Sequence, residues 1–500
     1  MSTTKSIQQL GSESVLYGFS SIVGRVLNYL LVPFYTSVFS PAEYGTVTVW
    51  YAYAAFLQVL YTYGMETTYF RFAARGEAQY FYAATSLLIV TSSLFSGILA
   101  LLAAPIAQGL GHPGTTHYVY YFAAILSVDA VMVVPLARLR LQQQALLFVG
   151  IKLLQILLNV FLNLVWLYGL PHIYAGEWWP QLQPWIAQWY DPAHRVAYVF
   201  RANLVANAAT IPLVAQAMYP FKWCLSWQYI RPILRYALPL FLMGLAGTAN
   251  EMFSRAALQH WLPADFYPGQ SNAAILGIFG ACYKLSIFMS LGIQAFRYAA
   301  EPFFFAQAKN RQAPALFSLV MYWFVVVGCF VLLATSINLE LLGYLLLRRG
   351  DYHMALPTVP YLLLAHLLLG IYYNLSIWFK ITDQVYYGIA ITSLGAVITV
   401  VGNMLLIPSA GYWGSVWATL ASYTTMSGVC YYWGQRRYPI PYRLKIGLGY
   451  IMGTMLFTVL ANTIPYPSFT SAVVSNLLLT IVFGSVLYIV AWRWAPRPIR

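Results

Sequence analysis

The chain has 500 residues, of which 60% are hydrophobic and only 8% are charged. It carries 27 basic and 13 acidic residues, whereas a soluble protein of this length would carry roughly 125 charged residues. Together with a mean hydropathy of +0.66, this composition excludes a soluble enzyme, a disordered chain and a nucleic-acid binder. The chain is expected to be an all-α polytopic membrane protein, in which basic residues act first as topology signals.

A helix that spans a bilayer needs about 20 mostly apolar residues. The sequence predicts about fourteen such helices, because its apolar runs are long and do not alternate as strands would. In chain order they lie near residues 14–38, 46–69, 80–107, 117–137, 143–168, 196–218, 233–258, 272–297, 313–335, 354–379, 384–407, 412–433, 444–463 and 470–492. The polar N-terminal residues lack the short apolar core of a cleaved signal peptide, so we expect insertion through the helices themselves.

The basic residues follow the positive-inside rule when the N-terminus is placed in the cytoplasm. Of the 27 lysines and arginines, nineteen then fall in cytoplasmic segments, four in external segments and four within the predicted helices. The exception to the alternation is the pair Arg348 and Arg349, between the ninth and tenth helices. Most of the positive charge is therefore explained by topology rather than by a partner.

Two stretches of the sequence indicate an internal repeat. PAEY precedes the second predicted helix and PADF precedes the eighth. Gly45 is followed 21 residues later by Glu66, as Gly280 is by Glu301, and an aromatic run follows each glutamate. Aligned without gaps over thirty residues, the two stretches share five identities. Chance similarity in a biased composition is the alternative explanation.

Because the proposed repeat is six helices long, its two copies would have the same orientation in the membrane. We expect an N-terminal lobe at residues 1–222, a C-terminal lobe at 223–437 and two additional helices at 438–500. The two lobes would enclose a central cavity and would give alternating access by rocking about it.

The residues around the second helix resemble a known family. Residues 18–50 read GFSSIVGRVLNYLLVPFYTSVFSPAEYGTVTVW, and residues 277–305 read GIFGACYKLSIFMSLGIQAFRYAAEPFFF. A first helix with an apolar-proline-apolar end, followed by a PxEYG turn, resembles the polysaccharide flippases of the Wzx type. These belong to the multidrug/oligosaccharidyl-lipid/polysaccharide (MOP) exporter superfamily. The resemblance covers nearly the whole chain and implies two six-helix lobes plus two C-terminal helices; an aromatic insertion between helices 5 and 6 departs from it.

The resemblance also implies a function. Such a flippase moves an undecaprenyl-pyrophosphate-linked oligosaccharide from the cytoplasmic to the periplasmic leaflet, for O-antigen, capsule or exopolysaccharide synthesis. It would lie in the bacterial inner membrane with both termini in the cytoplasm. Its partners would be the lipid-linked oligosaccharide, membrane lipids and other polysaccharide assembly proteins, with no nucleic acid and no cofactor.

Ionisable residues within the predicted helices point to a binding site. A charge at the bilayer centre costs about 2.5–3.5 kcal/mol on insertion scales, so it normally faces a cavity or a partner. These residues are the cations Arg25, Lys152, Arg255 and Lys284 and the anions Asp129 and Glu251. Since arginine binds phosphate oxygens in bidentate geometry, we expect the four cations to hold the substrate pyrophosphate in the central cavity.

Some of these charges have a structural alternative. Glu251 and Arg255 are four residues apart on one helical face and could simply pair with each other. Asp129 could neutralise Arg25 or Lys152 in the same way. We expect Asp129 and Glu251 to be supporting polar groups of the cavity.

Four further polar residues are candidates for supporting or gating roles. Asn28 and Tyr29 follow Arg25 by three and four residues, so their side chains would share its face of the helix. Glu66 and Glu301 lie at the expected cytoplasmic ends of their helices. Because a carboxylate repels phosphate, we expect a gate or a coupling-ion site at these two glutamates rather than substrate binding.

The segment at residues 171–195 is rich in aromatic side chains. It holds Trp178, Trp179, Trp185 and Trp189 and is expected to lie outside the membrane. Tryptophan at this position favours an interfacial segment in the headgroup region, and stacking on sugar rings is the alternative.

Motifs of soluble catalysis are missing from the sequence. It contains no GxxxxGK[ST] phosphate loop, no HExxH metal site and no GxSxG nucleophile elbow. We therefore expect a transporter rather than an enzyme, driven by something other than ATP hydrolysis on this chain. Two alternatives stay open: a membrane polysaccharide polymerase or ligase of the same pathway, and a cation-coupled drug antiporter of the same superfamily.

Overall fold

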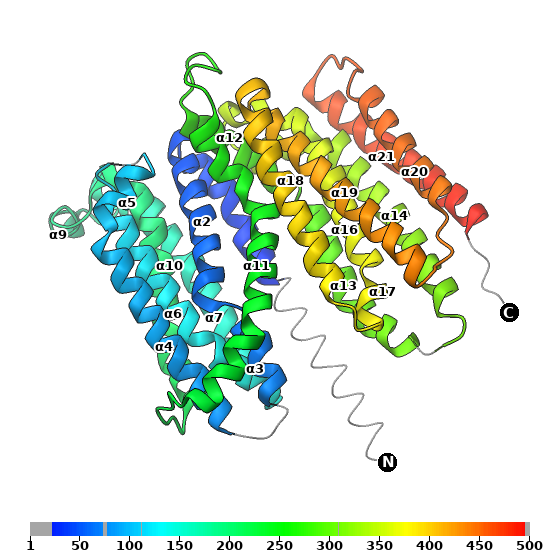
Figure 1. The fold of residues 1–500 in the computed structure, drawn as a ribbon. Coiled ribbons are helices and arrows are strands. Elements are labelled where there is room, and N and C mark those ends of the chain that lie inside the picture. Colours follow the sequence, from blue (N-terminus) through cyan, green and yellow to red (C-terminus); the bar gives the residue numbers. More distant parts are fainter. Residues whose placement is uncertain (1–22, 74–77, 112, 309, 496–500) are drawn as a thin grey trace. The chain divides into compact units, whose positions relative to one another are not determined.

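The computed structural model describes residues 23–73, 78–111, 113–308 and 310–495, and this part of the chain contains helices and no strands (Figure 1). All fourteen predicted spans overlap helices, although the first nine residues of the first span lie outside the described residues. The first helix covers residues 23–38. Those that follow are α2 (Pro41–Thr62), α3 (Met65–Ala73), α4 (Ala78–Leu101), α5 (Ala103–Gly109), α6 (Thr116–Leu141), α7 (Ala145–Leu164), α8 (Leu170–Tyr174), α9 (Gln183–Ile186), α10 (Arg195–Met218), α11 (Trp227–Trp261), α12 (Asn272–Leu285), α13 (Ile287–Gln307), α14 (Ala313–Ile337), α15 (Leu339–Leu346), α16 (Val359–Leu375), α17 (Ile377–Ile381), α18 (Tyr386–Ala410), α19 (Tyr412–Arg437), α20 (Leu444–Ala461) and α21 (Phe469–Trp494).

Length and hydropathy identify many of these helices as membrane spans. Within the described residues, nine helical segments are long and apolar enough to cross a bilayer, and α12 with α13 makes a tenth if the bent pair is one span. The chain is thus an all-α multi-pass membrane protein, as predicted. The remaining predicted spans coincide with helices that fall below this test, so the number fourteen stays a prediction.

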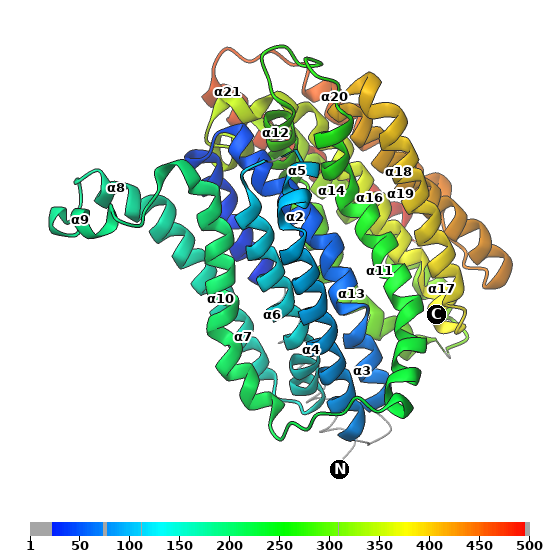
Figure 2. The same ribbon diagram turned by 60° about the vertical axis from the view of Figure 1, so that its left-hand side comes forward.

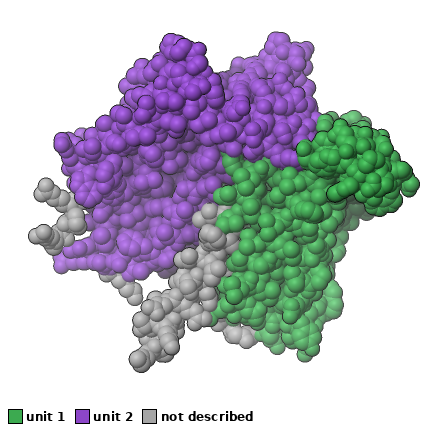
Figure 3. Space-filling view, turned by 180° about the vertical axis from the view of Figure 1, so that it is seen from behind, with its two compact units in different colours: residues 1–31, 49–248 green, residues 32–48, 249–500 purple. Residues whose placement is uncertain are grey.

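The chain forms two compact units (Figure 3). Unit 1 comprises residues 1–31 and 49–248, and unit 2 comprises residues 32–48 and 249–500. The long helix α11 contributes to both, because the division falls inside it. The predicted lobe boundary at residues 222 and 223 precedes this helix. The lobes expected from the repeat stay a prediction.

Unit 1 is held together by two apolar clusters that share α6. One joins α3, α4, α6 and α11 through side chains such as Met65, Phe81 and Ile233. The other joins α6, α7 and α10 through Met132 and Ile151, among others. Because α6 faces helices on several sides, 56% of its apolar window is buried, against 11% for the span that begins with α7. The helix α6 is therefore the central helix of this unit.

The PAEYG motif in unit 2 begins helix α2 and brings this helix into close contact with α12. Ser40 and Glu43 form reciprocal hydrogen bonds at the start of α2: the Ser40 backbone N–H donates to Glu43 Oε2 (2.9 Å), and the Glu43 N–H donates to Ser40 Oγ (3.4 Å). This capping box fixes the helix start. The backbones of α2 and α12 then approach each other closely at two glycines. A Cβ added to Gly45 would lie 1.8 Å from the Ala273 carbonyl oxygen, and one added to Gly277 would lie 1.9 Å from the Pro41 carbonyl oxygen. Only glycine permits this crossing of α2 and α12.

The last two helices of unit 2 present apolar side chains outward. Only 11% of the apolar window of α21 is buried, and Leu478, Ile481 and Val482 are each more than half exposed. A continuous exposed apolar surface of this kind is what contact with lipid requires. The helix α20 is similar, with 17% of its window buried.

Candidate functional site

Unit 1 contains a chain of polar side chains that links two of the predicted site residues. Lys152 Nζ on α7 donates to Gln155 Oε1 (3.2 Å), and the Gln155 amide donates to Asn207 Oδ1 on α10. The Asn207 amide in turn donates to Asp129 Oδ1 on α6 (2.8 Å). All three hydrogen bonds point from the cation toward the anion, so each polarises the next. Lys152 and Asp129 are thus connected through two amides, and the direct neutralisation considered above is not formed.

Arg25 lies on the exposed side of the first helix. Its neighbour Gly24 is buried, and a Cβ added there would lie 2.7 Å from the Ile156 side chain of α7. Arg25 and Asn28 are both exposed, whereas Tyr29 is buried with 8% of its surface exposed. The expected polar face therefore consists of Arg25 and Asn28, and the Tyr29 ring packs inside.

Unit 2 places the buried Arg255 against an aromatic ring. The Arg255 guanidinium lies 4.3 Å from the centroid of Tyr283, which is one residue before Lys284 on α12. Its Nη1 also donates to the backbone carbonyl of Glu251 (3.1 Å). The structural ion pair considered for Glu251 and Arg255 is not formed, because the guanidinium turns to the ring and to the carbonyl. A cation over a desolvated ring is stabilised by about 2 kcal/mol.

A histidine that the sequence analysis did not single out supports this ring. His366 on α16 is buried, and its Nδ1 bonds the Leu362 carbonyl oxygen (2.8 Å). Since a carbonyl can only accept, Nδ1 carries the hydrogen, and Nε2 of the neutral ring is an acceptor. The Tyr283 hydroxyl then donates to Nε2 (3.3 Å). His366 on α16 thus holds the Tyr283 ring on α12, and this ring holds the Arg255 guanidinium on α11.

Lys284 and Glu251 carry exposed charges in the same part of unit 2. Both Arg255 and Glu251 act electrostatically on Lys284, so the three charges form one group. Among the described residues, neither Lys284 nor Glu251 forms an ion pair with another side chain. Exposed charges within a predicted span require water or a charged ligand, because lipid would not solvate them.

The two repeat-related glutamates occupy corresponding ion pairs. Glu66, at the start of α3, pairs with Arg140 in the last turn of α6. Glu301 on α13 pairs with Lys380 on α17 at 2.7 Å, and Arg297 lies 3.6 Å away. In each case the cation lies just beyond the C-terminal end of the predicted span two positions further along the chain, 117–137 for Arg140 and 354–379 for Lys380. These pairs lie within single units, and a gating or coupling role for either glutamate stays a prediction.

The tryptophan-rich segment forms a small helical projection from unit 1, beyond the ends of α7 and α10 (Figure 2). Trp178, Trp179, Trp185 and Trp189 are 42–62% exposed. His172 stacks on Trp178 with ring centroids 4.8 Å apart and bonds Glu177 at 2.5 Å. Exposed indole rings on an ordered support suit either of the two surfaces considered from the sequence, a headgroup layer or a sugar ring.

Comparison with known proteins supports the fold and part of the sequence resemblance. The sequence profile of a family described as "Polysaccharide biosynthesis protein" matches residues 37–178. The inward closed structure of the lipid II flippase MurJ is similar with a TM-score of 0.70, covering 96% of this chain and 99% of that one at 11% identity. The chain therefore has the fold of this flippase, as the sequence resemblance implied.

Multidrug transporters of the MATE family share this fold as well. An inward-facing structure matches with a TM-score of 0.62 at 13% identity, covering 83% of this chain and 94% of that one. An outward-facing structure matches with a TM-score of 0.54 at 16% identity, covering 85% and 95%. No protein of curated function matches the sequence.

Proposed function

We propose that this protein is a flippase that moves an undecaprenyl-pyrophosphate-linked oligosaccharide from the cytoplasmic to the periplasmic leaflet of the bacterial inner membrane. It would serve the synthesis of O-antigen, capsule or exopolysaccharide, as a transporter rather than an enzyme. The profile match over residues 37–178 supports a role in polysaccharide biosynthesis. The fold shared with a lipid II flippase supports a lipid-linked substrate.

The observation that carries the proposal is the exposure of Arg25 and Lys284. Each cation lies in a predicted span, is exposed, and forms no ion pair with a described residue. A pyrophosphate offers the compact negative charge that such cations bind. In this proposal Arg255 and Lys152 complete the positive site, while Asn28, Tyr29, Asp129 and Glu251 support it.

In the same proposal, Glu66 and Glu301 control the cytoplasmic mouth. Both glutamates are at least one-third exposed at the side chain and can exchange partners. The protein would have both termini in the cytoplasm and would act beside other polysaccharide assembly proteins.

Replacement of the two exposed cations tests the proposal. Arg25→Ala and Lys284→Ala are introduced separately, and Arg231→Ala, an exposed cation at the start of α11, is the matched control. At equal membrane levels, we expect surface polysaccharide to fall and lipid-linked oligosaccharide to accumulate in the first two strains only. Normal export by both variants would contradict the proposal.

A second candidate, a cation-coupled drug antiporter, is favoured by the fold shared with MATE transporters. Its cation would bind at an acidic group such as Asp129. It predicts drug accumulation in a deletion strain with unchanged surface polysaccharide, which separates it from the flippase and from a polymerase or ligase.

A further inference from the structure

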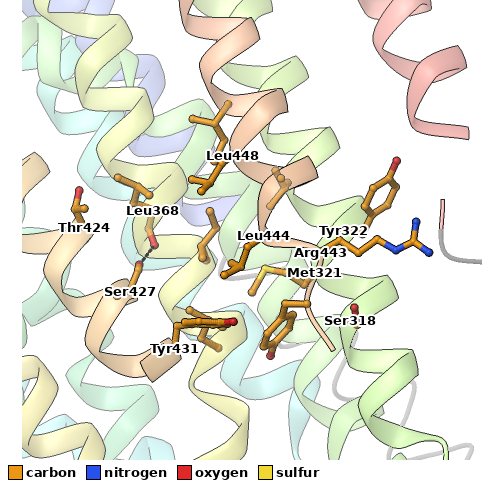
Figure 4. Close-up of a pocket in the computed structure, with 17 residues that line it drawn as sticks. Ser318, Met321, Tyr322, Leu368, Thr424, Ser427, Tyr431, Arg443, Leu444 and Leu448 are labelled. Carbon is orange, nitrogen blue, oxygen red and sulfur yellow. Dashed lines mark hydrogen bonds between the residues drawn. The ribbon is translucent and has the colours of Figure 1, made fainter. Parts of the chain in front are cut away.

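A cavity with apolar walls lies within unit 2, between α14, α16, α19 and α20 (Figure 4). Its volume is about 290 Å³. The walls include Met321, Val325, Leu368, Leu448 and Ile451. A space of this kind beside the lipid-facing helix α20 is suited to hydrocarbon.

Most polar side chains that line the cavity are already bonded to the protein. Ser427 donates to the Leu368 carbonyl (2.8 Å), as Figure 4 shows, and Ser318 donates to the Pro441 carbonyl (2.6 Å). Tyr322 donates to the Ala491 carbonyl (2.7 Å). These groups therefore offer no free donor to a ligand.

Tyr442 is different. Its hydroxyl oxygen is buried and has no hydrogen-bond partner among the described residues, although the residue lines the cavity. Burial raises the pKa of Tyr442, so the hydroxyl keeps its proton and is a donor. A buried donor without a partner is unfavourable, and a ligand carbonyl or phosphate oxygen would satisfy it.

The edge of the cavity beside Tyr442 is basic. Arg443 lines the cavity, and Figure 4 shows its side chain running outward past Tyr322. It donates to the Trp494 carbonyl at the end of α21 (2.7 Å), so the last turn of α21, with Arg493, lies at the same edge. The cations on these neighbouring helix ends are Arg436, Arg437, Arg443, Lys445 and Arg493. From residue 384 to the C-terminus, the sequence contains seven basic residues and no acidic one.

We propose that this cavity binds an anionic phospholipid of the bilayer, with an acyl chain between the helices, an ester or phosphate oxygen at the Tyr442 hydroxyl and the headgroup at Arg443 and Lys445. The lipid is a bound component of the protein and not its cargo, so the inference goes beyond the proposed function. Basic pockets between membrane helices select anionic headgroups, and positive loops at the cytoplasmic face meet the leaflet in which such lipids are enriched.

Two glycines of α20 allow a matched test. Gly447 lines the cavity, and a Cβ added there meets no atom within 4 Å, so Gly447→Leu would fill the cavity without a clash at its first carbon. Gly449 on the same helix also has open space at its Cβ but does not line the cavity, so Gly449→Leu is the control. Arg443→Gln removes the headgroup cation, and Arg437→Gln removes one charge at the end of α19 as its control.

The experiment is native mass spectrometry of the purified full-length protein with phosphatidylglycerol or phosphatidylcholine of identical acyl chains. We expect the wild type to retain phosphatidylglycerol preferentially. Gly447→Leu should lower this retention to that of phosphatidylcholine, while Gly449→Leu retains the wild-type value. Arg443→Gln should weaken binding about fivefold, as expected for one cation near an anionic lipid, and Arg437→Gln less.

Three results would overturn the proposal. Equal retention of the two lipids would remove the anionic preference, and unchanged retention in Gly447→Leu would place the lipid elsewhere. Tighter binding of undecaprenyl phosphate than of phosphatidylglycerol, lost in Gly447→Leu, would make the cavity a cargo site. Thermal unfolding of each variant in phosphatidylcholine shows whether it is folded. If Gly447→Leu does not fold, the lipid retention of Arg443→Gln decides the test. None of these outcomes depends on flippase activity.

Discussion

The Lys380 ammonium lies 2.7 Å from a carboxylate oxygen of Glu301 and joins α17 to α13. The corresponding pair in unit 1, Glu66 with Arg140, joins α3 to α6. Each ion pair joins the C-terminal ends of two predicted spans, the second and fourth in unit 1 and the eighth and tenth in unit 2. The repeat itself was inferred from five identities and stays a prediction.

Charge reversal tests the role of that contact. Glu301→Lys should reduce export by placing like charges together, and the double variant Glu301→Lys with Lys380→Glu should restore it. The side chains of Glu301 and Lys380 are 38% and 28% exposed, so the loss of stability should be about 1 kcal/mol, as for solvent-accessible pairs. Surface polysaccharide and thermal unfolding in detergent are measured together. If the double variant is as stable as the wild type but does not restore export, Glu301 would instead be a coupling-ion site.

The glycine crossing of α2 and α12 should tolerate no side chain. Gly45→Ala places a methyl group 1.8 Å from the Ala273 carbonyl oxygen, and a backbone atom cannot move aside as a flexible side chain can. We expect a loss of about 1–3 kcal/mol or more in the free energy of unfolding. Gly97→Ala on α4, where the added carbon meets open space, is the control and should unfold at the wild-type temperature or slightly above it. Equal unfolding temperatures for the two variants would contradict this packing.

The polar chain of unit 1 should depend on Asn207. Asn207→Ala removes the acceptor for the Gln155 amide nitrogen and the donor to Asp129, so each loses this partner, while Gln155 still accepts from Lys152. The expected cost is about 1–3 kcal/mol for a buried polar group without a partner. Asn203→Ala, on the same helix, removes one hydrogen bond to the Tyr51 hydroxyl (3.1 Å) and should cost about 1 kcal/mol. Thermal unfolding compares the two, and a larger loss for Asn203→Ala would argue against a connected network.

The ring of Tyr283, more than its hydroxyl, should support Arg255. Tyr283→Phe keeps the ring 4.3 Å from the guanidinium and loses the contacts of the hydroxyl, among them the hydrogen bond to His366. Tyr283→Leu loses both contacts. We expect near-normal export for the first variant and reduced export for the second, because Arg255 then loses its stacking partner. Similar activity in both variants would show that Arg255 holds its position without the ring.

The sequence predicted the class of fold but left several contacts undetermined. The apolar runs mark the helices because each must satisfy its own backbone in lipid. By contrast, Gln155 and Asn207 are uncharged amides 52 residues apart, and no periodic pattern signals that they meet. Glu251 and Arg255 have the spacing of an ion pair, yet the guanidinium binds Tyr283 from another helix, which local spacing cannot reveal.

The domain boundary was predicted from the proposed six-helix repeat and lies before α11, at residues 222 and 223. The compact units divide inside α11, between residues 248 and 249, so the predicted lobes stay a prediction. The PAEYG motif was informative as a family resemblance. Its physical basis, a capping box followed by a glycine crossing, became visible only with α12 in place.

In the proposed function, the exposed cations Arg25 and Lys284 bind the pyrophosphate of a lipid-linked sugar. The direct measurement is translocation of an undecaprenyl-pyrophosphate-linked oligosaccharide in vesicles that contain only the purified protein. We expect Arg25→Ala and Lys284→Ala each to slow translocation, while Arg231→Ala translocates at the wild-type rate. Translocation at the wild-type rate by the double variant Arg25→Ala with Lys284→Ala would contradict the proposed function.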